Sequence, residues 1–470
     1  MSWKQKADQA ENKIVSDLKA LISIKSVLDE SASTGEAPFG PGPKQALDWL
    51  LARGREAGMS VKEVDGVAGH VEIGEGEGLL GILCHVDVVP AGDGWETPPF
   101  EGHERNGKVY GRGAIDDKGP TIAAFHALKM VQESNIPLNK RVRLIVGTDE
   151  ESEFRCMKRY FETEEMPEIG FAPDADFPII HAEKGIADLV FSQLPGDNEG
   201  PLRSFHSGDR TNMVPDKAWA EIAVSESMDG FDEEFRAYLE ATGTSGELAM
   251  HGDSCLITLH GKAAHAMEPD DGVNAGILLA QFLDPYMEGA SARFTSFVVQ
   301  AFGDGSRGHA LKMDFSDEIS GETTLNAGIL TYNGAKGGEI SVSVRYSVTY
   351  PKEGKLAACR EALEGSGFSL DIVSDSPPHH VDARDPLIRT LSEVYERQTG
   401  EQAELLAIGG GTYARTLEKG VAFGMLFPGR PDVGHQADEY VEIGDLVKAA
   451  AIYADAIASL AGEQPTDKNN

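Results

Sequence analysis

A histidine and an aspartate at the end of an apolar run are the first candidates in this chain for a chemical role. In GLLGILCHVDVVP, residues 78–90, His85 closes the run and Asp87 follows two positions later. Side chains on a strand alternate between its faces, so these two should point the same way. A carboxylate beside an imidazole selects its tautomer and prepares it to bind a metal. Alone, the pair is more typical of a structural histidine at a strand end, so further ligands must come from elsewhere.

Three acidic segments and a late histidine could supply those ligands. GRGAIDDKGP (111–120) places two aspartates before an expected helix, where capping is the alternative role. GTDEES (147–152) packs three acids at a strand end, which is costly without cations unless the loop is solvated. FAPDADFP (171–178) alone predicts a turn, and His435 in GRPDVGHQADEYVEI (429–443) alone predicts an exposed loop residue. Together, these nitrogen and oxygen donors form the ligand set of a two-metal site and suit zinc, manganese or cobalt.

The elements that must position these residues alternate between helix and strand over the first 180 or so residues. The opening segment predicts an amphipathic helix with Ile14, Leu18, Leu21 and Ile22 on one face. The alternation indicates an α/β fold with a mostly parallel sheet and flanking helices. Because ligands bind at the carboxyl ends of such strands, His85 and the acids after RVRLIVGT should share one rim.

The pattern changes character in the middle of the chain. Residues 184–380 contain antiparallel-looking strands interrupted by helices, which predicts an inserted α+β domain. Residues 381–470 resume the first pattern, so they should complete the domain that residues 1–183 begin. The final residues, EQPTDKNN, predict a frayed end.

Composition excludes several classes of function. The 470 residues carry a formal net charge of −35, which argues against nucleic acid and anionic membrane surfaces as partners. Without a run of about 18 apolar residues, a membrane span is not expected. Cys84, Cys156, Cys255 and Cys359 are widely scattered, so neither a disulfide framework nor a cysteine-ligated zinc is expected. These features predict a cytoplasmic protein.

Taken together, the motifs resemble a known family. HVD, GRGAIDDKG, DEE and the late histidine, in this order and spacing, are similar to the dinuclear metallopeptidase family of glutamate carboxypeptidase, aminoacylase and succinyl-diaminopimelate desuccinylase. The resemblance covers nearly the whole chain and is strongest to the PepV-type bacterial dipeptidases. The segments that carry this closer likeness are HSGDRTNMVPD (206–216), GGGTYAR (409–415), AFGMLFPG (422–429) and HQADE (435–439).

The resemblance implies a catalytic α/β domain with a dinuclear metal site, interrupted by an α+β lid domain. It implies two divalent ions, most often zinc, with manganese or cobalt as alternatives. Glu150 matches the general base that takes a proton from the water between the ions, and Asp87 matches the residue that orients His85. The implied ligands are His85 and Asp174 for one ion, Glu151 and His435 for the other, and Asp116 as the bridge.

The resemblance also implies residues that contact substrate. His265, in HGKAAHAMEPDDGVNAG (260–276), matches a lid histidine that stabilises the oxyanion, with capping of the next helix as the alternative. Asn212 and Arg345 match substrate-binding lid positions, although Arg345 could equally have a surface or salt-bridged role. GGGTYAR is similar to a loop that receives the substrate carboxylate, with a plain flexible loop as the alternative. The residues expected there are Gly410, Gly411, Thr412 and Arg415.

The function implied is that of a metal-dependent dipeptidase. It would hydrolyse dipeptides with a free N-terminus, act as a monomer, and bind neither nucleic acid nor membrane. An alternative within the family is a deacylase or desuccinylase of N-acyl amino acids, which would tolerate a blocked amine. A second alternative is a non-catalytic peptide-binding relative, whose signature would be loss of the base or of a ligand.

Overall fold

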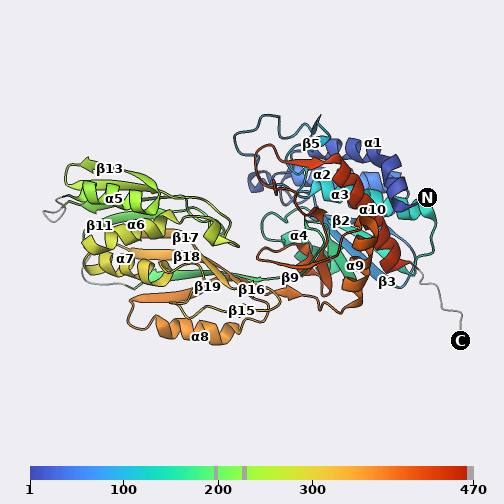
Figure 1. Cartoon of the computed structure of the whole chain (residues 1–470). Helices are drawn as coiled ribbons and strands as arrows, with labels where there is room; N and C mark the ends of the chain where they lie inside the picture. Colours follow the sequence, from blue (N-terminus) through green and yellow to red (C-terminus); the bar gives the residue numbers. More distant parts are fainter. Residues whose placement is uncertain (195–199, 225–229, 463–470) are drawn as a thin grey trace. The chain divides into compact units, whose positions relative to one another are not determined.

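The computed structural model describes residues 1–194, 200–224 and 230–462. Within them the chain forms two compact units (Figure 1). The predicted frayed end, residues 463–470, lies outside the described residues. Unit 1 comprises residues 1–181, 380–406 and 411 onward, and unit 2 comprises residues 182–379 and 407–410.

A sheet covered by helices forms the frame of unit 1. Its strands lie in the order β1-β2-β6-β3-β7-β22-β9-β20, and β21 pairs with β9. Strand β3 runs parallel to β6 and to β7, and β7 runs parallel to β22, whereas β1–β2 and β2–β6 are antiparallel. Parallel strands therefore occupy the middle of the sheet, and the predicted α/β class is confirmed. The bounds are β1 Ser60–Val64, β2 Ala68–Ile73, β3 Gly78–His85, β6 Lys140–Gly147, β7 Ile169–Ala172, β9 Ile179–Glu183, β20 His379–His380, β21 Leu405–Ile408 and β22 Gly420–Ala422.

Short strands outside this sheet hold the loops around its carboxyl ends. Strand β8, Ala175–Asp176, pairs in parallel with β23, Met425–Leu426. The prediction of a simple turn at residues 171–178 is therefore wrong in part, because main-chain pairing with a segment some 250 residues away draws its centre into a strand. A second small sheet joins β4 His103–Arg105, β5 Lys108–Tyr110 and β24 Tyr440–Glu442.

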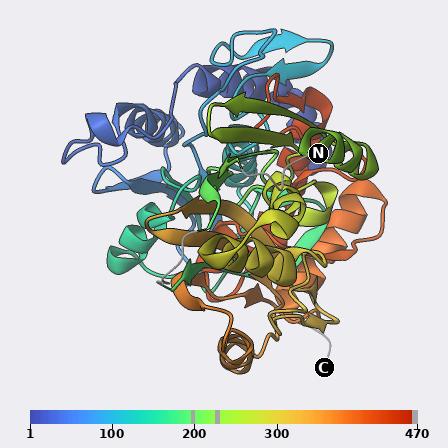
Figure 2. The ribbon, with the colours of Figure 1, turned by 90° about the vertical axis from the view of Figure 1, so that its left-hand side faces the viewer.

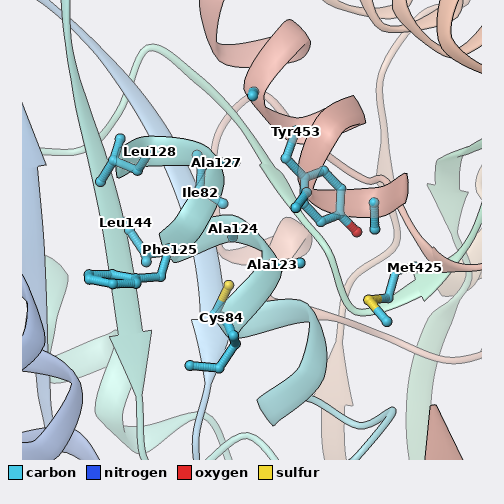
Figure 3. Packing of buried hydrophobic residues seen from close by; sticks show 14 of the residues in the cluster. Ile82, Cys84, Ala123, Ala124, Phe125, Ala127, Leu128, Leu144, Met425 and Tyr453 are labelled. Atoms are coloured by element: carbon cyan, nitrogen blue, oxygen red, sulfur yellow. The ribbon is translucent and has the colours of Figure 1, made fainter. Parts of the chain in front are cut away.

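Helices pack on the sheet of unit 1 and bury its apolar strands. Figure 3 shows Ile82 and Cys84 of β3 facing the alanine-rich side of α3, with Tyr453 of α10 close by. Small residues on α3 allow this close approach, and the resulting core fixes the level at which β3 ends. The helices of unit 1 are α1 Trp3–Ile22, α2 Pro41–Glu56, α3 Lys118–Ser134, α4 Arg155–Thr163, α9 Pro386–Thr399 and α10 Ile443–Ala461.

The first helix follows its sequence pattern closely. It begins with a capping box in which Ser2 and Gln5 satisfy each other's main-chain amides. The apolar face predicted for this helix is confirmed, because its four residues are fully buried and α1 packs against α3 and α10. Those four residues are Ile14, Leu18, Leu21 and Ile22.

Unit 2 is built on an antiparallel sheet with the strand order β13-β14-β12-β11-β17-β18-β10-β19. Along β10, buried and half-buried residues alternate, as expected when one face packs on a core. Helices α6 and α7 lie side by side (Figures 1 and 2). The bounds are β10 Gly185–Gln193, β11 Leu202–Ser207, β12 Lys217–Ala223, α5 Phe231–Thr242, β13 Ser245–His251, β14 Ser254–His260, α6 Ala275–Leu283, α7 Gly289–Phe302, β15 Ser316–Asp317, β16 Gly321–Glu322, β17 Thr324–Asn333, β18 Gly337–Tyr346, α8 Lys352–Ala362 and β19 Phe368–Ser376.

The helices were compared with the length and apolarity that a membrane-spanning helix needs. In the described part of the chain, none of them combines the length and the apolarity that crossing a bilayer requires.

Candidate metal centre

Two neighbouring strands of unit 1 bring the first site residues together. β3 ends at His85, which is in register with Gly147 at the end of β6. The turn that follows β6 therefore delivers Glu150 and Glu151 to the level of His85. A side chain at Gly147 would lie 2.2 Å from the Tyr413 hydroxyl oxygen, so only glycine permits this close approach. His85 and the acids after β6 therefore lie at the same edge of the sheet, as predicted, because β3 and β6 end in register.

Asp116 lies between two histidines that are 350 positions apart in the chain (435 − 85). Its Oδ1 is 3.1 Å from Nε2 of His85, and its Oδ2 is 2.9 Å from Nε2 of His435. The same nitrogen of His435 lies 3.0 Å from Oε2 of Glu151. Each oxygen of one carboxylate thus faces a different imidazole, which is the arrangement a bridging ligand needs.

Asp174 and Asp117 approach the cluster from the side of His85. Oδ2 of Asp174 is 3.6 Å from Nε2 of His85. Within the described residues, two sets of donor atoms each lie within 4.8 Å of one another, and they share His85. One set adds Asp117 and Asp174, and the other adds Asp116 and Glu151. Asp117, which the sequence motifs left unassigned, also accepts a hydrogen bond at Oδ2 from the main-chain amide of His85 at 3.0 Å.

Asp87 contacts both the ring of His85 and the main chain of Glu151. Nδ1 of His85 lies 3.0 Å from the main-chain oxygen of Asp87 and 3.5 Å from its carboxylate Oδ1. Oδ2 of Asp87 accepts a hydrogen bond from the amide of Glu151 at 3.1 Å. Because Nδ1 is engaged in this way, Nε2 of His85 is left to face the acids. Asp87 thereby connects the ends of β3 and β6.

The acids after β6 do not share one role. Asp149 is buried and pairs with Arg155, with a 2.6 Å contact between Oδ1 and Nη2. For Asp149, the cation that the three consecutive carboxylates were expected to need is this guanidinium. The pair fixes the start of α4 and leaves Glu150 and Glu151 for the cluster.

Burial and mutual repulsion shape the charges of the remaining acids. Burial, opposed by His85 and assisted by Asp174, raises the pKa of Glu150 well above its usual range. Burial and the Asp116 charge raise the pKa of Glu151 to about 7. Hydrogen bonds with Asp116 and Glu151 raise the pKa of His435 to about 11. Too many negative groups therefore share a small volume, and positive charge at this place would stabilise them.

The residues present fit divalent metal ions. Oδ1 of Asp87 and Oδ1 of Asp117 are buried and, within the described residues, have no hydrogen-bond partner. The nearby donors are imidazole nitrogens and carboxylate oxygens, and the imidazole of His85 is oriented by a main-chain oxygen. This donor set suits zinc, manganese or cobalt.

The cluster opens into a cavity of about 200 Å³ in unit 1. Its wall includes Asp116, Asp174 and His435 together with Asp176 and Asp432. A small polar ligand can therefore reach the carboxylate of Asp116 without displacing the core.

Two residues within the recognised motifs prove to be structural partners. Arg112 of GRGAIDDKGP and Glu439 of HQADE form a fully buried ion pair, with 2.6 Å between Nη1 and Oε2. The neighbouring Asp438 accepts hydrogen bonds from the amides of Glu96 and Thr97. The opposite charges in these two motifs could have suggested an ion pair, but the sequence alone does not show which charged residues pair.

The candidate substrate residues Asn212 and His265 lie in unit 2. Met213 and His265 form a β-bridge, and the amide of Ala266 donates to the main-chain oxygen of Asn212. Nδ1 of His265 accepts from the amide of Met267, whereas the side chain of Asn274 caps α6. The alternative role for His265, capping the following helix, is therefore filled by another residue.

Arg345 and the glycine-rich segment also have defined neighbours. Arg345 on β18 is buried, so the alternative of a surface role is wrong, and its Nη1 donates to the main-chain oxygen of Gly409 at 3.2 Å. Within the segment, Thr412 caps a short helical turn by accepting from the amide of Ala414. A side chain at Gly411 would meet Nη1 of Arg415 at 2.1 Å. Gly410 belongs to unit 2, and Gly411, Thr412 and Arg415 belong to unit 1.

A helix-flanked α/β sheet with histidines and carboxylates at its carboxyl ends defines a hydrolase of the metallopeptidase class. Comparison with known families agrees, because the description "Peptidase family M20/M25/M40" matches residues 81–459. The chain belongs to this family, which confirms the resemblance noted from the motifs.

Relatives in sequence span the whole chain. The Bacillus subtilis (strain 168) protein named "Putative dipeptidase YtjP" is 49% identical over 467 residues, covering 98% of this chain and 100% of the relative. A Staphylococcus epidermidis (strain ATCC 12228 / FDA PCI 1200) protein named "Putative dipeptidase" is 44% identical over 467 residues, covering 98% of this chain and 100% of the relative.

Solved structures with little sequence likeness share the fold. The di-peptidase Dug1p of Saccharomyces cerevisiae has a TM-score of 0.57 at 14% identity, covering 97% of each chain. Human carnosine dipeptidase 1 has a TM-score of 0.55 at 15% identity, covering 97% of this chain and 98% of the other.

Proposed function

We propose that this protein is a metal-dependent dipeptidase that hydrolyses dipeptides with a free N-terminus. The observation that carries the proposal is the placement of Asp116 between His85 and His435, with Glu151 and Asp174 beside them. The names of the full-length relatives point to the same substrate class.

The cluster would hold two divalent ions, with zinc as our first assignment and manganese or cobalt as alternatives. Bound there, such ions would acidify water and polarise a carbonyl oxygen. His85 and Asp174 would bind one ion, and Glu151 and His435 the other. Asp116 would bind both, because its two oxygens already face the two imidazoles.

Glu150 would handle the protons of the reaction. It follows Asp149, whose pairing with Arg155 fixes the turn, and it precedes the ligand Glu151. Its carboxylate would take a proton from the attacking water and pass it to the departing amine nitrogen. Asp87 would act through its neighbours, since it positions both the His85 ring and the Glu151 main chain.

Residues of unit 2 and the glycine-rich segment would bind the substrate. His265 would donate a hydrogen bond to the oxygen of the scissile carbonyl, and Asn212 and Arg345 would contact the substrate main chain. Main-chain amides at Gly410, Gly411 and Thr412, with Arg415, would receive the terminal carboxylate. In this proposal residues 1–183 and 381–470 form the catalytic domain, and residues 184–380 form the lid.

Substrate panels with and without metal test the proposal. Metal-free protein should regain activity with zinc, manganese or cobalt, and it should cleave free dipeptides but not their N-acetylated forms. Tripeptides and tetrapeptides cleaved as efficiently as dipeptides would contradict the dipeptide assignment. Preference for N-acetylated substrates would instead identify the alternative deacylase or desuccinylase. Metal binding without any hydrolysis would leave only the non-catalytic peptide-binding alternative.

We further propose that the protein is a cytoplasmic monomer. In the described residues all four cysteines are buried and free, in keeping with a reducing compartment. The family resemblance associates a long inserted domain with the monomeric state. Light scattering of the metal-loaded protein in solution would test the monomer directly.

A further inference from the structure

The buried Arg112–Glu439 pair contacts the main chain on both sides of the proposed metal site. Its two side chains are 1% and 0% exposed. Charged side chains are rarely buried so deeply unless other groups pair with them and accept or donate hydrogen bonds.

The carboxylate of Glu439 binds the loop that carries Asp116. Its Oε1 accepts from the amides of Ile115, at 2.9 Å, and of Asp116, at 3.3 Å. Its Oε2 accepts from Nη1 of Arg112, at 2.6 Å, and from the amide of Gly113, at 3.1 Å. Each oxygen therefore serves two donors, and the main chain at Asp116 is held directly.

The guanidinium of Arg112 binds the main chain of His435. Its Nη2 donates to the carbonyl oxygen of His435 at 3.1 Å, and also to those of Ala91 at 3.2 Å and Pro90 at 3.5 Å. Within the described residues, its Nε has no hydrogen-bond partner. His435 has a φ of 63°, a conformation that is unfavourable for residues other than glycine. A hydrogen bond to its carbonyl helps to hold it in that conformation.

Resting on the function proposed above, we propose that Arg112 and Glu439 are positioning residues that set the separation of Asp116 and His435. Glu439 binds the main chain of Asp116, and Arg112 binds the main chain of His435. The two side chains are joined by their own 2.6 Å contact. Neither residue belongs to the proposed metal ligands or to the proposed substrate-binding residues. It acts by keeping the two ligands at a distance that a cation can bridge.

Glu439→Gln tests this role with little change in volume. In either orientation, the amide NH2 of glutamine replaces an oxygen that faces two donors, so one side of the network is broken. Arg112→Lys keeps the charge but cannot reach Glu439 and the carbonyls of Ala91 and His435 together.

The Arg143–Glu72 pair supplies matched controls in the same unit. Its closest contact is 2.7 Å, its side chains are 6% and 15% exposed, and it joins β6 to β2 away from the cluster. Glu72→Gln and Arg143→Lys therefore also break a mostly buried ion pair, but they leave the main chain of Asp116 and His435 untouched.

Calorimetric titration of each metal-free protein with Zn²⁺ is the deciding measurement. We expect Glu439→Gln to weaken zinc binding by about 10- to 100-fold, as mutations of residues that support metal ligands do. We expect a smaller loss for Arg112→Lys and wild-type affinity for both controls. The visible spectrum of the Co²⁺-loaded protein should change in the first two variants only.

Wild-type zinc affinity in Glu439→Gln, or an equal loss in Glu72→Gln, would overturn the proposal. If Glu439→Gln does not fold, Arg112→Lys and Arg143→Lys decide it on the same criteria. Dipeptide hydrolysis by the zinc-loaded wild type is measured separately. Its absence would contradict the proposed function but would leave the comparison of zinc affinities intact.

Discussion

The two units differ in how they hold their candidate site histidines. His85 in unit 1 is fully buried, and its ring nitrogens face Asp87, Asp116 and Asp174. His265 in unit 2 is half-buried, and its Nδ1 accepts from a main-chain amide two residues away. The comparison shows that the charged chemistry is assembled within unit 1, whereas unit 2 presents its residues on local main-chain structure.

This difference has a physical reason. Parallel strands end at one edge, so loops from distant parts of the chain converge there and can bury a group of charges. In unit 2, by contrast, His265 lies in a loop, where a bridge between Met213 and His265 holds two short segments against each other. We therefore expect changes in unit 1 to affect metal binding and catalysis, and changes in unit 2 to affect substrate binding and catalysis without affecting metal binding.

Removing metal should have the largest effect. We expect chelation to reduce dipeptide hydrolysis to the uncatalysed background, because bound ions supply several kcal/mol of transition-state stabilisation. Activity is measured before chelation, after dialysis, and after addition of zinc, manganese or cobalt. Full activity in protein shown by elemental analysis to be metal-free would contradict the assignment of metal-dependent chemistry to unit 1.

Glu150→Gln should separate catalysis from metal binding within unit 1. We expect kcat to fall by about 10²–10⁴-fold, the usual contribution of a general acid–base group. Metal content should stay at the wild-type level, since Glu150 is not one of the proposed ligands. Glu153→Gln, at an exposed acid of the same turn, is the control. Hydrolysis that survives in Glu150→Gln would refute the assigned base.

His265→Ala should show the contrasting behaviour of unit 2. We expect kcat to fall by about 10²–10³-fold, as for loss of one oxyanion donor, with zinc affinity unchanged. His260→Ala, at a partly exposed histidine of the same unit, serves as the matched control. Loss of zinc binding in His265→Ala would mean that the two units do not divide the labour as proposed.

His70→Gln should have the smallest effect, confined to stability in acid. Burial lowers the pKa of His70 to about 3, and the hydroxyl of Tyr160 lies 2.7 Å from its Nδ1. The folded state therefore excludes a proton that the unfolded chain binds below its ordinary pKa of 6.5. Stability from the neutral ring is complete above pH 6.5 and is lost as the pH falls towards 3.

Denaturant unfolding of metal-free protein at several pH values measures this loss. Between pH 6 and 4 the wild type should lose about 1.4 kcal/mol per pH unit more than His70→Gln. His103→Gln, at an exposed histidine of unit 1, should follow the wild type. Parallel curves for wild type and His70→Gln would show that His70 is not held neutral.

Parts of this architecture could be predicted from local sequence. The apolar face of α1 follows from helical periodicity, and the end of β3 at His85 follows from an apolar run that stops. Short strands escaped prediction, since β8 exists only through its pairing with β23. The roles of Asp149, Glu150 and Glu151 could not be separated by position alone, because Arg155 rather than spacing neutralises the first of them.

The chemical groups of the candidate site can be recognised in the sequence. Residue types and periodicity are local properties, so imidazoles, carboxylates and the strands that carry them can be recognised in the chain. The folded chain was needed to show that Asp116 faces both His85 and His435, and that Arg112 pairs with Glu439. The contacts of Asp116 with His435 and of Arg112 with Glu439 join segments hundreds of residues apart, because strand register and loop packing set the distances between groups that the sequence leaves unconnected.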